Sequence, residues 1–364
     1  MRGARPNADR IRGVGLRLSA LVACLLVPAS TAAQDRRWEI EGYGGLVAAQ
    51  TASVGRVTLP AAGAPLVTSN PTFPSRETPS WFFGDGATLL NGVNAAFDRS
   101  ARIVPLDAAF GALESSRVPV FGVRLRRYLS ARYALEFSVD AQATSGIRAD
   151  TMPAIVEATR ASFTTAFTDL LASGPFTGAA VVATASTQAG SRRDIAFTGA
   201  LVRTFRPSRA FAPYVTIGAG VIAGTGSLPS SSLDARYRFS VLGEVPIDET
   251  DRVSFRYARG AAFAGVLGGG VRRDLSGAWA LRIDARVLLG PDTTRVLIDA
   301  QPSSVRGVPA GFIESFTNPG VQFSNDPATG RRSTLSGAGL HGFAVFKGGF
   351  QARSLVTVGL ARQF

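Results

Sequence analysis

The last stretch of the chain, Leu355 to Phe364, alternates apolar side chains with small or polar ones. Val356, Val358 and Leu360 share one parity, and the stretch ends on the aromatic Phe364. Because successive side chains of a strand point to opposite faces, this pattern predicts a β-strand with one apolar face. A chain that ends in such a strand needs other strands to pair with it.

The clearest partner segments lie between Val118 and Gln142. Two alternating runs flank the tight turn Ser130-Ala131-Arg132. On both runs one face is apolar and the other carries charges, so we predict a hairpin. In a water-soluble sandwich the charged face would meet solvent, whereas in a membrane barrel it would line the lumen.

The same reading along the chain predicts eight strands, three tight turns and four long connections. The other strands are expected near residues 38–47, 195–205, 211–223, 261–273, 278–289 and 351–364. The remaining turns are Arg206-Pro207-Ser208-Arg209 and Asp274-Leu275-Ser276-Gly277, and the long connections span about 49–117, 143–192, 224–250 and 290–349. This order predicts an all-β, antiparallel up-and-down transmembrane barrel, with both termini on the short-turn side.

The long connections contain short helices in this prediction. Asp85 to Phe97 and Thr151 to Ser173 have apolar residues at helical spacing. Residues 236–242 and 252–257 instead alternate like strands. They form either a hairpin outside the membrane or an extra spanning pair, which would give ten strands.

Residues 1–33 are predicted to be a secretory signal peptide. Five arginines precede an apolar core, and Thr31-Ala32-Ala33 suits cleavage before Gln34. An alternative is lipidation at Cys24, although that cysteine lies inside the apolar core. No other stretch is apolar for the roughly 18–20 residues that a membrane helix needs, so a membrane-spanning form has to be a closed barrel.

The formal net charge of +13 allows several kinds of partner. The basic residues are scattered arginines without a run, which disfavours nucleic acid and suits a phosphate-bearing lipid surface. With Cys24 in the leader, the mature chain has no cysteine for disulfides or zinc thiolates.

The signal peptide, the order of strands and turns, and the terminal Phe364 together resemble the small eight-stranded outer-membrane barrels of the OmpA/OmpX type. The resemblance implies the outer membrane of a Gram-negative-type bacterium, contacts with outer-membrane lipid and lipopolysaccharide, and a monomer. It also implies that barrel-assembly machinery reads the last strand as an assembly signal, through Val356, Val358, Leu360 and Phe364. Arg362 departs from the family pattern, which usually has an aromatic or apolar residue there; at the rim it can snorkel to phosphates.

An eight-stranded barrel is expected to be filled by its own side chains, which must pair if they are charged. A structural salt-bridge network is the first interpretation of the inward charges, and a narrow gated polar pore is the alternative. The predicted lumenal residues are Arg124, Arg126, Glu136, Asp140, Arg282, Asp284 and Arg286. Trp38, Tyr133 and Trp279 lie next to the short turns or the terminus and are predicted to form an aromatic girdle at the periplasmic interface.

The sequence offers little for catalysis. His341 is the single histidine, and Ser336 lies near it in sequence only. Gly265 to Gly270 lacks the GK[ST] signature and the following helix of a phosphate loop. We therefore expect no enzyme, no cofactor and no metal, and a structural or surface-interaction barrel whose loops carry recognition. The alternatives are a small porin or transport channel, a soluble lipocalin-like barrel, and a lipid-modifying enzyme.

Overall fold

The computed structural model describes residues 38–50, 55–65, 76–110, 117–143, 151–172, 176–205, 211–241, 246–276, 278–304, 321–323, 325 and 332–364. The predicted signal peptide 1–33, Cys24 and the turn 206–209 lie outside the described residues. Among the described residues, no helix is both long enough and apolar enough to cross a membrane.

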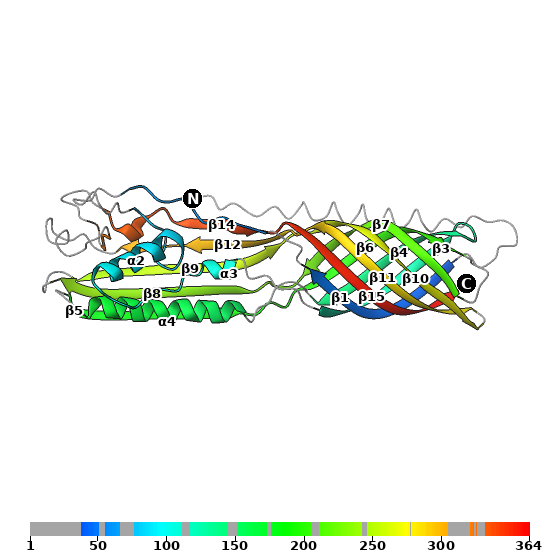
Figure 1. Ribbon diagram of the computed structural model, residues 1–364, viewed down its shortest axis with the longest axis horizontal. Helices are drawn as coiled ribbons and strands as arrows, with labels where there is room; N and C mark the ends of the chain where they lie inside the picture. The colour runs from blue at the N-terminus through cyan, green and yellow to red at the C-terminus, as the bar shows by residue number, and fades with distance from the viewer. Residues whose placement is uncertain are drawn as a thin grey trace, which may run out of the picture. The chain divides into compact units, whose positions relative to one another are not determined.

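Eight antiparallel strands close into a barrel (Figure 1). The order around the ring is β1-β15-β11-β10-β7-β6-β4-β3. This confirms the all-β class and the eight-stranded antiparallel barrel. The strands are β1 (Trp38–Gln50), β3 (Arg117–Tyr128), β4 (Tyr133–Ala143), β6 (Arg193–Thr204), β7 (Phe211–Thr225), β10 (Ala262–Ser276), β11 (Trp279–Pro291) and β15 (Phe350–Gln363).

Strand β15 closes the ring between β1 and β11. Hydrogen bonds in both directions join Trp38 and Phe364, with N–O distances of 3.3 and 3.0 Å. The predicted alternation is present, because Val356 is 56% exposed on the outside while Thr357 is 2% exposed in the lumen. This part of β15 therefore presents an apolar face to the outside and a polar face to the lumen.

A second sheet forms from segments that the sequence analysis placed in long connections. Its order is β2-β14-β12-β9-β8-β5, with β13 paired to β9. Strand alternation was predicted in these connections only at residues 236–242 and 252–257, and cross-strand pairing extends the sheet to segments for which no strand was predicted. The strands are β2 (Arg56–Val57), β5 (Phe176–Gln188), β8 (Ser230–Val241), β9 (Ile247–Arg259), β12 (Thr294–Ala300), β13 (Ser303–Ser304) and β14 (Leu340–Lys347).

Strands β8 and β9 correspond to the two alternating segments for which a hairpin outside the membrane and an extra spanning pair were both considered. They pair with each other and with β5 and β12, not with the barrel strands. The alternative of a ten-stranded barrel is therefore wrong.

One face of the second sheet is covered by helices and packs an aromatic core. The predicted helices are present as α2 (Gly84–Ala96) and α4 (Thr151–Leu171). Two short helices were not predicted: α3 (Asp107–Phe110) and the 3-10 helix η3 (Thr334–Ser336). Phe167 of α4 stacks 4.2 Å from Tyr237 of β8, measured between ring centroids. Trp81 and Phe82, just before α2, are fully buried in the same core. We call this sheet with its helices the sheet body.

Candidate functional site: the barrel lumen

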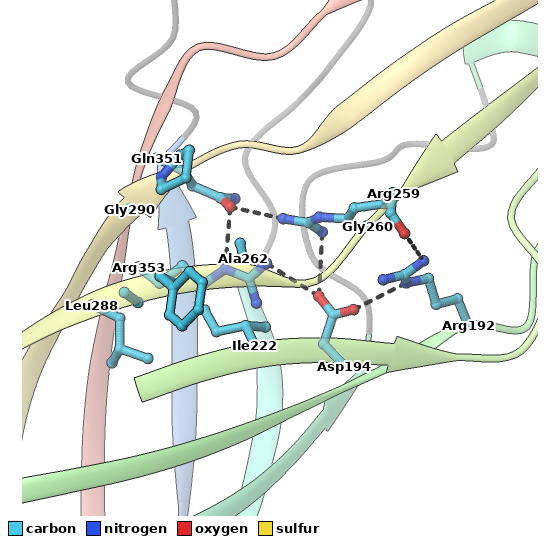
Figure 2. A pocket seen from close by; sticks show the side chains of 13 residues that line it. Arg192, Asp194, Ile222, Arg259, Gly260, Ala262, Leu288, Gly290, Gln351 and Arg353 are labelled. Carbon is cyan, nitrogen blue, oxygen red and sulfur yellow. Dashed lines mark hydrogen bonds and ion pairs between the residues drawn. The ribbon is translucent and has the colours of Figure 1, made fainter. Parts of the chain in front are cut away.

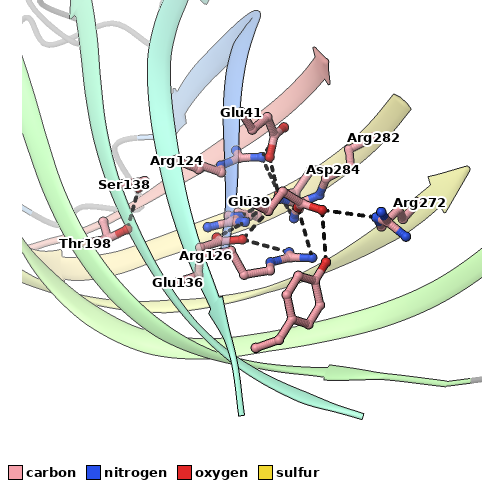
Figure 3. A network of polar contacts seen from close by, with 12 residues as sticks. Glu39, Glu41, Arg124, Arg126, Glu136, Ser138, Thr198, Arg272, Arg282 and Asp284 are labelled. Carbon is pink, nitrogen blue, oxygen red and sulfur yellow. Dashed lines mark hydrogen bonds and ion pairs between the residues drawn. The ribbon is translucent and has the colours of Figure 1, made fainter. Parts of the chain in front are cut away.

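The centre of the lumen is organised around Glu136 of β4, which is 1% exposed (Figure 3). Arg126, Arg282 and Arg286 all reach this carboxylate. The N–O distances are 2.8 Å from Arg126, 3.1 Å from Arg282 and 2.5 Å from Arg286. Three guanidinium groups therefore converge on one buried carboxylate.

A second group of ion pairs adjoins the first and contains Asp284 and Glu41. Arg124 contacts Asp284 at 2.8 Å and Glu41 at 3.2 Å, and Arg286 contacts Asp284 at 2.6 Å. Arg282 also pairs with Glu41, so it links the two groups. The lumenal charges form one connected network.

Glu39 extends this network toward the end of the barrel that carries the short turns. It accepts a hydrogen bond from the Tyr128 hydroxyl at 2.9 Å and contacts Arg272 at 3.3 Å and Arg126 at 3.7 Å. The carboxylates Glu39, Glu41, Glu136, Asp140 and Asp284 match the guanidinium groups of Arg124, Arg126, Arg272, Arg282 and Arg286 in number. The formal charges in this part of the lumen therefore cancel.

Aromatic rings fill the space around the arginines. The Arg124 guanidinium lies 3.8 Å from the centre of the Tyr43 ring, and that of Arg282 lies 4.8 Å from the centre of the Tyr214 ring. A Cβ at Gly270 would lie 2.5 Å from the Tyr214 hydroxyl oxygen. The same Cβ would lie 2.2 Å from the Ile283 carbonyl oxygen, so the neighbouring strand and the inward Tyr214 together require glycine at this position.

The structure brings together six of the predicted lumenal residues in ion pairs and leaves the seventh apart. Asp140 is buried in the lumen at 4% exposure, but it makes no ion pair with any residue in the described ranges. Glu39, Glu41 and Arg272 also belong to the network, although they were not among the residues predicted from sequence. A signal was present, because Glu39 and Glu41 alternate with Trp38 and Ile40 and therefore share the inner face.

Beyond this network the lumen is crossed by an apolar layer. Inward side chains from six strands form it, with Val118 of β3 packed against them. On β15 the order along the strand is Thr357, then Leu355, then Arg353, so the layer separates two polar zones. Its buried members are Val47, Ala196, Ile222, Ala264, Val266, Leu288 and Leu355.

The second polar zone surrounds Asp194 (Figure 2). Arg192, Arg259 and Arg353 converge on its carboxylate at 3.1, 3.2 and 3.1 Å. Gln351 accepts hydrogen bonds from Arg259 at 2.7 Å and from Arg353 at 3.2 Å. The space left among these side chains is about 10 Å³, room for about one water molecule. The lumen is therefore closed by charged groups, by an apolar layer and by charged groups again.

The predicted girdle residues lie at the other end of the barrel. Tyr133 is 40% exposed and Trp279 is 42% exposed on the outer surface, while Trp38 is half-buried. The Arg362 guanidinium lies 5.6 Å from the centre of the Trp279 ring. This stacking gives a physical reason for an arginine at the position where Arg362 departs from the family pattern.

The remaining sequence candidates do not form a catalytic group in the described part of the chain. His341 is exposed on β14, while the Ser336 hydroxyl donates to the Ser333 carbonyl oxygen at 2.5 Å. Among the described residues there is no group of three or more His, Cys, Asp or Glu side chains that could hold a metal ion.

No protein-family model matches the sequence, and no curated protein matches it significantly. The chain is similar to the P. putida toluene transporter TodX at 9% identity and a TM-score of 0.19, with 91% of each chain covered. It is also similar to the TodX deltaS2S3 mutant monoaromatic hydrocarbon channel at 10% identity and a TM-score of 0.18, with 94% of each chain covered. Both scores are too low to carry an argument about this chain.

Proposed function

We propose that this protein is an outer-membrane barrel that anchors the sheet body at the cell surface for structural or recognition purposes. The observation that carries the proposal is the closed lumen. Ion pairs connect side chains from opposite walls, and the apolar layer crosses the same interior. A barrel filled in this way serves as an anchor, and recognition then falls to the parts outside it.

The outer surface of the barrel supports a membrane location. Large apolar side chains are exposed there, including Ile217 at 63%, Val356 at 56% and Ile283 at 53%. Such a surface is costly in water and suits lipid. The predicted signal peptide fits export to the outer membrane of a Gram-negative-type bacterium, with outer-membrane lipid and lipopolysaccharide as surroundings.

Assembly and oligomeric state belong to the same proposal. Strand β15 closes the barrel against β1 and presents Val356, Val358, Leu360 and Phe364 on its outer side. We propose that assembly machinery reads this strand and that the protein is a monomer. The proposal includes neither catalysis nor nucleic-acid binding.

A small porin or transport channel is the second candidate function. The observation in its favour is that charged residues line two zones of the lumen, and conducting barrels have a polar interior. Conduction would require the ion pairs of Glu136 and the contacts of the apolar layer to open together. Ion conductance distinguishes the two functions.

The membrane location is tested by fractionating cells and comparing gel migration with and without heating. The proposal expects the protein in the outer-membrane fraction, resistant to salt washing, with a heat-dependent shift in migration. Protease added to intact cells should cleave the sheet body and leave the barrel strands protected. Recovery in a soluble periplasmic fraction, or protection of the sheet body in intact cells, would overturn the proposal.

A further inference from the structure

The strand pair β11–β15 of the barrel continues into the pair β12–β14 of the sheet body. The barrel pairing ends at Pro291 and Phe350. Two backbone hydrogen bonds then bridge the gap, from Asp292 N to Gly349 O at 2.9 Å and from Gly348 N to Thr294 O at 2.7 Å. The next pair is Arg295 with Lys347, so the register fixes these two side chains close to the end of the barrel.

Arg295, Lys347 and Arg56 form a row of bases across three neighbouring strands, which we call the basic row. Arg295 pairs directly with Lys347, and Lys347 pairs directly with Arg56. All three residues are exposed. Like charges directly opposite each other destabilise a sheet, so the row is unfavourable without an anion to bind it.

The basic row lacks the acidic partners that other arginines of this sheet have. Within the described ranges, its three side chains make no ion pair or side-chain hydrogen bond. Arg236 and Arg252, further along β8 and β9, are each held by a cross-strand aspartate. Arg238 and Arg256 on the same two strands are exposed and, among the described residues, also make no ion pair, but each stands alone, whereas the basic row places three bases directly opposite one another.

The position of the basic row relative to the membrane follows from its distance along the strands to the apolar outer surface of the barrel. Phe350 and Phe263 are 52% and 78% exposed at this end of the barrel, where aromatic rings suit the membrane interface. Arg295 follows Pro291 by four residues, about 13 Å along a strand and less along a tilted one. The headgroup region extends the membrane by about 5–7 Å beyond the hydrocarbon core, so basic side chains that point back toward the barrel can meet it.

We propose that the basic row binds the phosphate groups of anionic lipid headgroups in the leaflet that surrounds this end of the barrel. The inference rests on the proposed membrane function. Arginine can hold a phosphate through two parallel N–H···O bonds, and lysine adds a point charge between the two arginines. A phosphate in this position removes the repulsion along the row. The contact also ties the sheet body to the membrane surface.

Lys347 makes the test specific, because it is the only lysine in the sequence. Reductive methylation with ¹³C-formaldehyde gives a single dimethyl-lysine NMR signal. Protein in phosphatidylcholine vesicles is compared with protein in vesicles that also contain lipid A, and with phosphatidylcholine vesicles to which inorganic phosphate is added. We expect the signal to shift with lipid A at concentrations where inorganic phosphate has no effect.

Two variants complete the experiment. The double variant Arg56→Gln/Arg295→Gln should require at least about tenfold more lipid A for the same shift. The control Arg252→Gln, which removes an arginine already paired with Asp234, should behave like wild type. A signal that ignores lipid A, or a double variant that responds like wild type, would overturn the inference. If the protein does not insert into vesicles, judged by heat-dependent migration, the proposed membrane function itself fails.

Discussion

Arg282 and Glu136 form an ion pair of 3.1 Å between strands that lie opposite each other in the ring of eight. Arg282 belongs to β11 and Glu136 to β4, which are separated by three strands on either side. The bond therefore crosses the lumen. Contacts of this kind make the interior a part of the folded core.

Glu136→Gln should strongly destabilise the barrel. The substitution leaves three guanidinium groups in the lumen with one carboxylate fewer, and breaking a buried ion pair costs about 3–5 kcal/mol. The measurement is the urea midpoint of the heat-dependent gel shift in vesicles. Glu157→Gln on the exposed side of α4 is the matched control and should change stability by less than about 0.5 kcal/mol. Equal midpoints for the two variants would contradict a connected lumenal network.

Gly270→Ala should destabilise the barrel through a collision inside the lumen. Its Cβ would lie 2.2 Å from the Ile283 carbonyl oxygen and 2.5 Å from the Tyr214 hydroxyl oxygen, so the neighbouring strand would have to shift and the tyrosine would have to move away from Arg282. Overpacking of this kind costs roughly 1–3 kcal/mol. The control is Gly42→Ala, because a Cβ there meets nothing within 4 Å. Comparable losses in the two variants, measured by urea unfolding, would show that these contacts with Ile283 and Tyr214 do not set the requirement for glycine.

Val356→Arg should prevent stable insertion if the barrel spans a bilayer. Val356 is 56% exposed near the middle of β15, and an arginine on the lipid face at that depth costs about 2–4 kcal/mol. Val182→Arg is the control. Val182 is 63% exposed on β5 of the sheet body, where the new arginine would be solvated by water and should not impair assembly. The measurement is the fraction of each variant that is assembled in the outer membrane, and it shows whether the barrel exterior faces lipid. Tolerance of both changes would indicate that the barrel exterior meets water.

The stability of the sheet body should fall as pH rises from about 4 to about 7. Burial of the Asp251 carboxyl raises its pKa to about 7, while hydrogen bonds from Trp81 N and Ser80 Oγ oppose the rise. Because the folded state then holds this proton more tightly than the unfolded state, the stabilisation is present at low pH and is lost as pH rises to the folded pKa.

Asp251→Asn should remove this pH dependence, since the amide carries no charge at any of these pH values. The expected difference between wild type and variant grows across the pH range, to on the order of 2–4 kcal/mol. Fluorescence of the buried Trp81, which lies beside Asp251, reports unfolding of the sheet body. An unchanged slope of stability against pH in the variant would contradict the assignment to Asp251.

The barrel could be predicted from sequence because its outer face is apolar and its inner face is largely polar or charged. Over Leu135–Gln142 of β4 and Leu281–Val287 of β11, apolar residues alternate with polar or charged ones, and this contrast fixes both the strand and the direction of each face. The same contrast located Glu136 and Arg282 in the lumen. Glu39 and Glu41 were missed as network members because glycines on β1 weaken the alternation around them.

The sheet body could not be predicted in the same way. Strand β5 is built from small alanine, serine and threonine residues, so its two faces look alike in sequence. Strand β12 has seven residues, and β14 is interrupted by Gly342, whose φ is +59°. Pairing with distant strands, rather than local pattern, makes these segments extended.

The convergence on Asp194 was also beyond sequence reasoning. Its partners Arg192, Arg259 and Arg353 are distributed over 162 positions of the chain. Only the closure of the ring brings β15 near β6 across the mouth of the barrel. The separation of these residues in the sequence does not predict that contact.

The closed lumen is tested most directly by conductance of the purified wild-type protein in planar lipid bilayers. We expect that the protein inserts, as shown by heat-dependent migration, and gives no steady unitary conductance in either direction of applied voltage. Steady openings of constant size in wild type, altered by Glu136→Gln, would contradict it and would favour the channel.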